Sequence, residues 1–264
     1  MKTDSIYCIA IDTGNTRTHI GLIRKSDAVC INSISFFTID IDKKILSSIE
    51  WLWVKSNSPH ISETVISSVV KNADLKIKSI LKKRFGPVID VKFTKDLKSI
   101  INYKYPESLG ADRIADTLYC CFTHPESNVL IIDAGTAIKT DVIINSQFLG
   151  GTIIPGIETQ FRSLHDSTSA LPLIESFSQK ITLPGISTSD CMIGGIIHGT
   201  AGALNNFVNI YKKKYSHDMI VLTTGGAWHH FKNLVNFEHE HIPELTLIGT
   251  SLYTLFSGKQ ANFP

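Results

Sequence analysis

Two stretches of the chain repeat one order of apolar and polar positions. Residues 7–21 read YCIAIDTGNTRTHIG, and residues 129–143 read VLIIDAGTAIKTDVI. Each consists of a β-branched apolar run, a turn that begins Asp-x-Gly, and a second run of strand character, which predicts a strand, a tight turn and a returning strand. Asp12 aligns with Asp133. A repeat that divides the chain into comparable halves predicts two duplicated domains facing each other across a cleft.

The rest of the pattern alternates between helical and strand-like segments. Helices are predicted at 41–55, 73–85, 157–165, 188–213 and 227–235, and a loop from Leu109 runs into a helix that ends near residue 122. Strands are predicted at 62–70, 87–93, 147–155 and 219–223. Such alternation is typical of α/β layers. We therefore expect an α/β protein with domains at residues 1–115 and 116–264.

Composition narrows the class of protein. The 264 residues are 43% hydrophobic and 19% charged, with a formal net charge of +2, so no strong field favours nucleic acid or an anionic membrane. Five cysteines with no C-x-x-C spacing argue against a disulfide framework and for a reducing compartment. No run approaches the roughly 18 apolar residues of a membrane span. We expect a cytoplasmic protein with no nucleic-acid or membrane partner.

The first repeated turn carries candidate chemistry. Asp12-Thr-Gly-Asn-Thr16 offers close backbone approach at Gly14 and polar donors at Asn15 and Thr16, which suit a phosphate, and a carboxylate that suits Mg²⁺. An ordinary hairpin is the competing interpretation, because Asp-x-Gly is common in turns. The second copy, with Gly135, Thr136 and Ala137 after Asp133, favours the phosphate interpretation.

Longer motifs resemble a known family. They are Tyr103-x-x-Pro-x-x-Leu-Gly-Ala-Asp-Arg113, Asp133-x-Gly-Thr-Ala137, Leu149-Gly-Gly-x-Ile-x-Pro-Gly156, Ala170-Leu-Pro172 and Leu245-Thr-Leu-Ile-Gly249. In this order they resemble the type III pantothenate kinases, within the actin/hexokinase-like superfamily. The resemblance implies an α/β fold of two duplicated actin-like (ribonuclease H-like) domains with ATP in the cleft between them.

The implied activity is ATP-dependent phosphorylation of the primary hydroxyl of pantothenate, the first step of coenzyme A biosynthesis. The resemblance assigns Asp112 as the carboxylate that orients this hydroxyl and accepts its proton, and Arg113 as the group that holds the pantothenate carboxylate. Capping of a helix is the alternative role for Asp112. The full implied substrate set is Tyr103, Gly110, Ala111, Asp112, Arg113 and Thr188.

The resemblance also implies ATP, Mg²⁺ and a monovalent cation, K⁺ or NH₄⁺, as cofactors. Asp12 and Asp133 would hold metal. The implied nucleotide contacts are Asp12, Gly14, Asn15, Thr16, Gly135, Thr136, Ala137 and, at a strand-turn-helix beside the adenosine, Gly225 and Gly226. Lys139 departs from the family, which has an uncharged residue there, and we hypothesise that its ammonium reduces the cation requirement. His19 receives no role.

Other functions stay open at this point. A kinase or phosphatase of the same superfamily acting on a sugar or an acetate-like acid would keep both Asp-x-Gly turns but would not predict Arg113 beside Asp112. A non-enzymatic branch of the family acts as an accessory factor for transcription. The resemblance further implies a homodimer. The histidines at 229, 230, 239 and 241 have no metal-site spacing and are expected at the surface or an interface.

Overall fold

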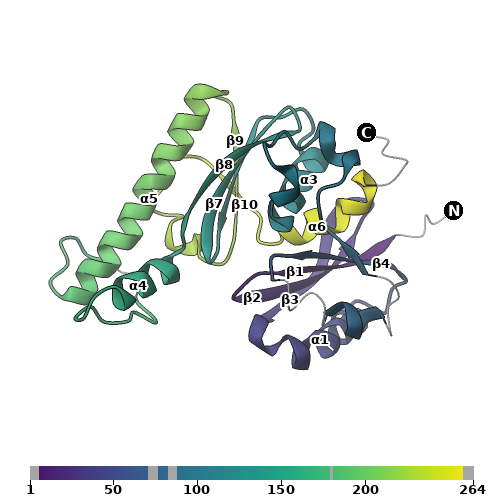
Figure 1. Ribbon diagram of the computed structural model, residues 1–264, viewed down its shortest axis with the longest axis horizontal. Helices are drawn as coiled ribbons and strands as arrows, with labels where there is room; N and C mark the ends of the chain where they lie inside the picture. Colours follow the sequence, from purple (N-terminus) through teal and green to yellow (C-terminus); the bar gives the residue numbers. More distant parts are fainter. Residues whose placement is uncertain (1–5, 71–76, 83–87, 179–180, 258–264) are drawn as a thin grey trace. The chain divides into compact units, whose positions relative to one another are not determined.

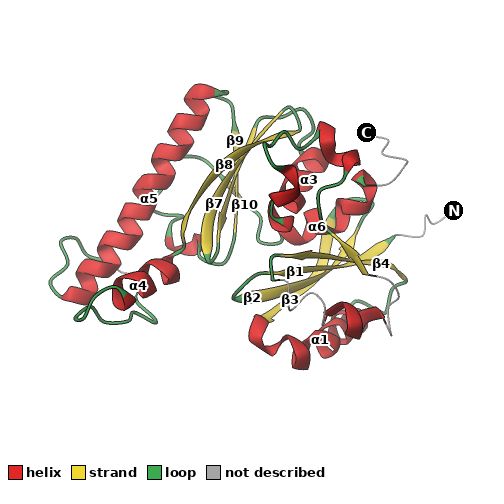
Figure 2. Cartoon of the chain, viewed as in Figure 1, coloured by secondary structure: helices red, strands yellow, loops and turns green. Residues whose placement is uncertain are grey.

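Two five-stranded sheets organise the chain (Figure 1, Figure 2). The computed structural model describes residues 6–70, 77–82, 88–178 and 181–257. The strands of the first sheet are β1 (Tyr7–Thr13), β2 (Arg17–Arg24), β3 (Val29–Phe37), β4 (Ile61–Ser68) and β5 (Val88–Asp90). The strands of the second are β6 (Val129–Ala134), β7 (Ala137–Ile144), β8 (Gln147–Pro155), β9 (Ile220–Thr224) and β10 (Glu240–His241).

The two sheets have the same topology. The first has the strand order β3-β2-β1-β4-β5, and the second, read from its other edge, has the order β8-β7-β6-β9-β10. Strand β1 pairs antiparallel with β2 and parallel with β4, and β6 likewise pairs parallel with β9. The hairpins predicted from the repeated sequence therefore form the matching centre of each sheet, and the duplication is confirmed.

Contacts between Cα atoms divide the chain into two compact units. One comprises residues 1–127, 143–150 and 244–264, and the other comprises 128–142 and 151–243. This division differs from the expected boundary after residue 115, because the C-terminal segment packs with the N-terminal part of the chain.

The first unit buries both faces of its sheet. Helix α1 (Ile41–Lys55) packs its apolar stripe, Ile41, Ile45, Ile49 and Leu52, against Ile9 and Ile11 of β1. Helices α3 (Ala111–Thr123) and α6 (Leu245–Phe256) lie on the opposite side of the sheet (Figure 1). Burial on two faces explains why β1 is a continuous apolar run rather than an alternating one.

Helix α6 was not predicted, although it determines where α3 lies. Its side chains are buried on nearly every side, and its sequence carries no charged residue that would mark a polar face. At Gly249 the two helices approach so closely that a Cβ atom would lie 2.0 Å from the carbonyl oxygen of Ala115. One turn earlier, the Thr246 hydroxyl donates a hydrogen bond of 2.7 Å to the buried Asp116 carboxylate of α3. The glycine of the Leu245–Gly249 motif thus serves helix packing.

The second unit contains α4 (Ile157–Asp166) and α5 (Thr188–Lys214) beside its sheet (Figure 2). The two helices are joined by a hydrogen bond of 3.1 Å from the Gln160 side-chain amide to the Thr200 hydroxyl. The predicted helix at 227–235 is wrong: only a 3-10 turn forms, at Trp228–His230. Trp228 and Phe231 are both buried. Because this short segment follows a tight turn and must place two large side chains in the core, it does not form a regular helix.

The predicted helix at 73–85 lies mostly outside the described residues, although 77–82 is helical. Within the described residues, none of the helices has the length and apolar content needed to cross a bilayer. All five cysteines are free thiols.

The close crossing of α3 and α6 predicts a strong effect of a small substitution. We expect Gly249→Val to lower the free energy of unfolding by about 1–3 kcal/mol, because the added side chain must push the Ala115 backbone away. Urea denaturation measures this change. Gly226→Ala is the control, since a Cβ there also meets nothing within 4 Å. It should change the free energy of unfolding by less than about 0.5 kcal/mol. An equal, small effect of both substitutions would contradict the packing role of Gly249.

Candidate active site

Hydrogen bonds from Thr38, the residue after β3, stabilise the first hairpin turn. The Gly14 amide donates to the Arg17 carbonyl at 3.0 Å, and the Thr38 hydroxyl donates to the Gly14 carbonyl at 2.8 Å. The Thr38 amide also donates to the Thr16 carbonyl at 3.0 Å. Asn15 and Thr16 are exposed at the tip. The turn is therefore fixed in shape while its predicted phosphate-binding side chains face outward.

Asp12 lies at the end of β1, among polar neighbours. It is directly opposite His19 of β2 and beside Ser67 of β4 in the strand register. Its side chain points away from the face that Ile11 presents to α1, because neighbouring residues on a strand alternate. Ser67 is fully buried, and its hydroxyl has no hydrogen-bond partner within the described residues.

The start of α3 lies next to this strand end. The Val69 amide, just after β4, donates to the Thr13 carbonyl at 3.2 Å. A Cβ built on Gly110, the residue that caps α3, would lie 3.9 Å from the Val69 side chain. The structure therefore places Asp12 and Asp112 at the same end of one unit.

Asp112 belongs to the first helical turn and is half-buried. The capping position itself is occupied by Gly110, with no side-chain cap. One Asp112 carboxylate oxygen accepts a hydrogen bond of 2.9 Å from the Arg113 amide. The positive end of the helix dipole adds to this bond in favouring the ionised carboxylate. Asp112 is thus suited to orienting a hydroxyl and to weak base catalysis.

Arg113 is a buried cation held by an aromatic ring. Its side chain is largely removed from solvent, at 7% residue exposure, and its guanidinium carbon lies 5.1 Å from the centre of the Phe148 ring. Tyr103 packs edge-on against the same ring, with centroids 5.6 Å apart. Phe148 therefore positions two predicted substrate residues at once. Sequence reasoning missed it, because a single aromatic residue in a strand gives no local signal of function.

The second hairpin turn is one residue tighter than the first. Here the Gly135 amide donates to the Ala137 carbonyl at 3.1 Å, so β7 begins two residues after the glycine rather than three. The bond places Asp133 opposite Lys139, as Asp12 is opposite His19. The Lys139 ammonium forms an ion pair of 2.7 Å with the Asp133 carboxylate, and the side chains are 13% and 17% exposed respectively. The predicted metal ligand Asp133 is thus neutralised by the chain itself.

Two further glycine turns converge on this hairpin within the second unit. Gly156, at the start of α4, donates its amide to the Thr136 carbonyl at 2.9 Å, and a Cβ on it would lie 2.1 Å from the Gly135 carbonyl oxygen. Gly225 has a positive φ of 90°, and a Cβ there would lie 2.4 Å from the Ala134 carbonyl oxygen. The glycines at these positions allow three backbone segments to meet at the end of β6.

Thr188 is the first residue of α5 and is exposed. The helix is capped by Ser187, which accepts from the Asp190 amide at 3.1 Å and donates to the Asp190 carboxylate at 2.7 Å.

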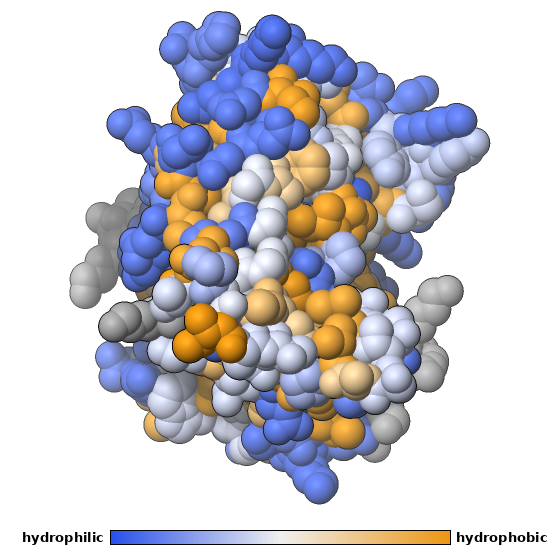
Figure 3. All heavy atoms as spheres, turned by 90° about the vertical axis from the view of Figure 1, so that its left-hand side faces the viewer, coloured by the Kyte–Doolittle hydropathy of each residue, from blue (hydrophilic) through white to orange (hydrophobic). Residues whose placement is uncertain are grey.

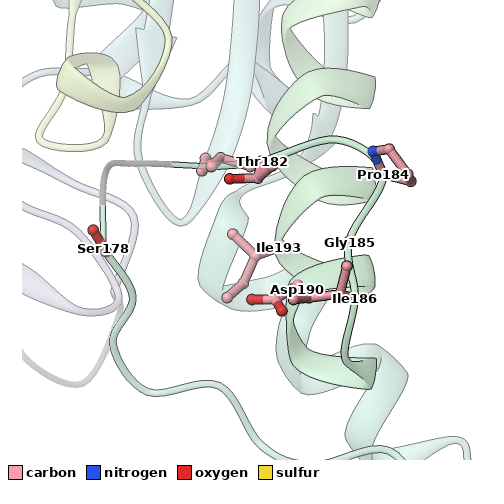
Figure 4. A pocket seen from close by; sticks show the side chains of 8 residues that line it. Ser178, Thr182, Pro184, Gly185, Ile186, Asp190 and Ile193 are labelled. Atoms are coloured by element: carbon pink, nitrogen blue, oxygen red, sulfur yellow. The ribbon is translucent and has the colours of Figure 1, made fainter.

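A pocket lies beside the start of α5. Asp190 and Ile193 extend into it from α5, while Pro184, Gly185 and Ile186 come from the segment alongside the helix (Figure 4). None of the predicted site residues lines this pocket.

The histidines after β9 do not form a metal centre. Within the described residues no group of three or more potential ligands gathers. The rings of His229 and His230 lie 3.8 Å apart, and His230 stacks on Phe177 at 4.8 Å. Burial, with a smaller contribution from His229, lowers the pKa of His230 to about 4. His230 therefore packs against an aromatic ring, whereas His229 is exposed.

Comparison with solved structures establishes the fold. A chain from Campylobacter jejuni, described as a candidate Baf family transcriptional activator, aligns with a TM-score of 0.59 at 18% identity and covers 93% of this chain and 96% of that one. An activator of 2-hydroxyisocaproyl-CoA dehydratase from Clostridium difficile, with bound ADPNP, gives 0.54 at 13% identity, covering 94% and 93%. A ROK hexokinase from Thermus thermophilus gives 0.51 at 12%, covering 94% and 98%. They confirm an α/β fold of two duplicated actin-like domains.

Sequence comparison is more specific. The family model for type III pantothenate kinase matches residues 8–210. A type III pantothenate kinase from Petrotoga mobilis is 31% identical over 250 residues, which are 93% of this chain and 97% of that protein. One from Flavobacterium johnsoniae is 30% identical over 232 residues, covering 86% and 89%. The chain therefore belongs to the type III pantothenate kinase family.

Proposed function

We propose that this enzyme transfers the γ-phosphoryl group of ATP to the primary hydroxyl of pantothenate, giving 4′-phosphopantothenate for coenzyme A biosynthesis. Membership of the family supports this activity. The structural observation that carries it is the placement of Asp12 and Asp112 at one end of the first sheet, since Gly110 at the start of α3 lies close to Val69 at the end of β4. A nucleotide-handling carboxylate and an acceptor-handling carboxylate then belong to one compact unit.

Asp112 is the catalytic residue of the proposal. One of its oxygens is held by the Arg113 amide, which fixes the orientation of the carboxylate. It would accept a hydrogen bond from the pantothenate hydroxyl, align the oxygen with the γ-phosphorus, and receive the proton as the new P–O bond forms. The transition state of phosphoryl transfer is loose and needs little prior deprotonation, so a weak base at the start of a helix is sufficient.

Arg113 would bind the carboxylate of pantothenate. A planar guanidinium can donate two parallel hydrogen bonds to a planar carboxylate, and the Phe148 ring lies beside the guanidinium. Because Arg113 is buried, pairing with the substrate anion is stronger than it would be in water. Tyr103, Gly110, Ala111 and Thr188 complete the proposed acceptor contacts.

The two Asp-x-Gly turns would hold the polyphosphate of ATP. The first turn offers Gly14, Asn15 and Thr16, and the second offers Gly135, Thr136 and Ala137, while Gly225 and Gly226 would lie beside the adenosine. Mg²⁺, bound with ATP, would neutralise phosphate charge during transfer. The half-buried Asp12, with the hydroxyl of Ser67 beside it in the register, suits a metal held directly or through water.

Two other functions remain testable. A kinase for another small alcohol or a sugar would use the same turns, but a buried arginine fits an acceptor that carries a carboxylate better than an uncharged sugar. A catalytically weak accessory protein would bind ligands without turnover. Dependence of ATP consumption on the identity of the acceptor separates all three functions.

We also propose that the enzyme is a homodimer, with α5 in the interface. Three exposed glycines, Gly195, Gly199 and Gly202, recur at helical spacing along α5, and a Cβ at each meets nothing within 4 Å. A second helix can approach such a face closely. The side of the second unit on which α5 lies carries a mixture of apolar and weakly polar residues over its middle. Hydrophilic residues gather where α5 ends (Figure 3).

Substitution of Asp112 tests the function and the catalytic role together. In a coupled assay we expect ATP consumption to require pantothenate and not sugars, and Asp112→Asn to lower kcat by roughly 100-fold or more with ATP affinity nearly unchanged. Asp42→Asn, also in the first turn of a helix but exposed on α1, is the control and should keep full activity. Turnover that depends on a sugar would exclude the proposed function, and unchanged kcat would exclude the role of Asp112.

Substitution of Arg113 tests recognition of the substrate carboxylate. Arg113→Ala should raise the KM for pantothenate by roughly 10-fold to 100-fold, the effect of losing a charge-assisted hydrogen bond, with a smaller change in the KM for ATP. Phe148→Leu should raise the same KM less, because the guanidinium loses its support but stays present. Steady-state kinetics with varied pantothenate measure both. A KM unaffected by Arg113→Ala would place the carboxylate elsewhere.

The homodimer has a simple physical test. Light scattering after size-exclusion chromatography should give twice the chain mass of 29.2 kDa. Gly199→Arg adds a long charged side chain to the exposed α5 face and should shift the mass towards the monomer. Arg162→Glu, on α4 outside the glycine face, should leave the mass unchanged. A monomeric mass for the unmodified protein would refute the assembly.

A further inference from the structure

We propose that Lys139 is a built-in cation of the second phosphate turn, which contacts the nucleotide phosphates and replaces a bound monovalent cation. The inference rests on the proposed function, since it assumes that this turn meets a polyphosphate. Its basis is the ion pair of 2.7 Å between the Lys139 ammonium and the Asp133 carboxylate.

The position of Lys139 is unusual for a lysine. Its side chain is 13% exposed, whereas lysines almost never lose most of their solvent contact without a specific partner. The hydrogen bond between Gly135 and Ala137 sets the register that places it opposite Asp133, so the ammonium is fixed to the turn by the backbone. The charge is therefore part of the turn and not a mobile surface group.

The surroundings of this pair suit an anion. The start of α4 reaches the same turn, where the Gly156 amide and the Thr159 hydroxyl donate to the Thr136 carbonyl at 2.9 Å and 2.7 Å. The positive end of the α4 dipole thus lies against the turn. An ammonium group has three N–H donors, so it can keep its contact with Asp133 and also donate to a phosphate oxygen.

The same pair argues against a metal ion at Asp133. A carboxylate attracts a small cation by its negative charge, but the charge of Asp133 is cancelled by Lys139 at 2.7 Å. A second cation bound there would also be repelled by the ammonium. The residues present therefore do not fit a monovalent metal site, and no step of the reaction is assigned to one.

The first turn shows what distinguishes the second. Register places His19 opposite Asp12, at the position equivalent to Lys139 opposite Asp133. The first aspartate thus lies opposite an imidazole, whereas the second lies opposite an ammonium group that contacts it at 2.7 Å.

Nucleotide affinity in different salts tests the inference. The Kd of a non-hydrolysable ATP analogue with Mg²⁺ would be measured by calorimetry in chlorides of K⁺, NH₄⁺ or tetramethylammonium at constant ionic strength. We expect the unmodified enzyme to bind equally well in all three, and its thermal midpoint to be the same. Lys139→Met should weaken binding by roughly 10-fold or more in tetramethylammonium, and K⁺ or NH₄⁺ should restore part of the loss.

Two variants separate this role from a purely structural one. Lys78→Met removes an ion pair of the same length, with Asp90 at 2.7 Å, from the first unit and should not create a cation dependence. Lys139→Arg keeps the charge, so its nucleotide affinity should be the same in all three salts. This variant tests the inference if Lys139→Met does not fold.

The outcomes that overturn the inference are distinct. Tighter binding by the unmodified enzyme in K⁺ than in tetramethylammonium would refute it while leaving the kinase function intact. So would unchanged affinity of a folded Lys139→Met enzyme in tetramethylammonium. Failure to bind nucleotide in any salt would overturn the inference together with the function on which it rests.

Discussion

The backbone contact between α3 and α6 is the constraint on which the proposed chemistry depends. Gly249 lets the helices approach until only a hydrogen atom fits between it and Ala115, and the bond from Thr246 to Asp116 fixes their register. Asp112 and Arg113 stand one turn before these contacts, at the start of α3. The position of the proposed catalytic carboxylate relative to β1 is therefore determined by the packing of a helix that itself carries no predicted substrate residue.

The duplicated sheets supply the second part of the arrangement. In each sheet, the strand that follows the Asp-x-Gly turn pairs antiparallel with the central strand. A parallel strand pairs with the other edge of that central strand. Asp12 and Asp133 thus end the central strands of two equivalent sheets. Close approach of backbones at Gly156 and Gly225 fixes the shape of the second turn, whereas Thr38 fixes the first. The two sheets therefore share one topology, although different local contacts fix their turns.

Sequence reasoning succeeded where a local pattern determines the structure. The amphipathic period predicted α1 at 41–55, and alternation with glycine turns predicted β8 at 147–155, both to the residue. The family motifs located Asp112 and Arg113 at a helix start. Helix α6 was missed because its sequence carries no charged residue to mark a polar face, and the helix at 227–235 was wrongly predicted because tertiary burial of Trp228 overrode the local helical pattern. Phe148 could not be found, since its role depends on Tyr103 and Arg113 meeting it from distant parts of the chain.

The one-residue difference between the hairpin turns breaks the equivalence of the duplicated sheets. One turn is shorter and has an ammonium opposite its aspartate, whereas the other keeps a longer loop and an imidazole. A phosphate group would therefore meet a different arrangement of charge at each turn, although the strands that carry the turns have the same order.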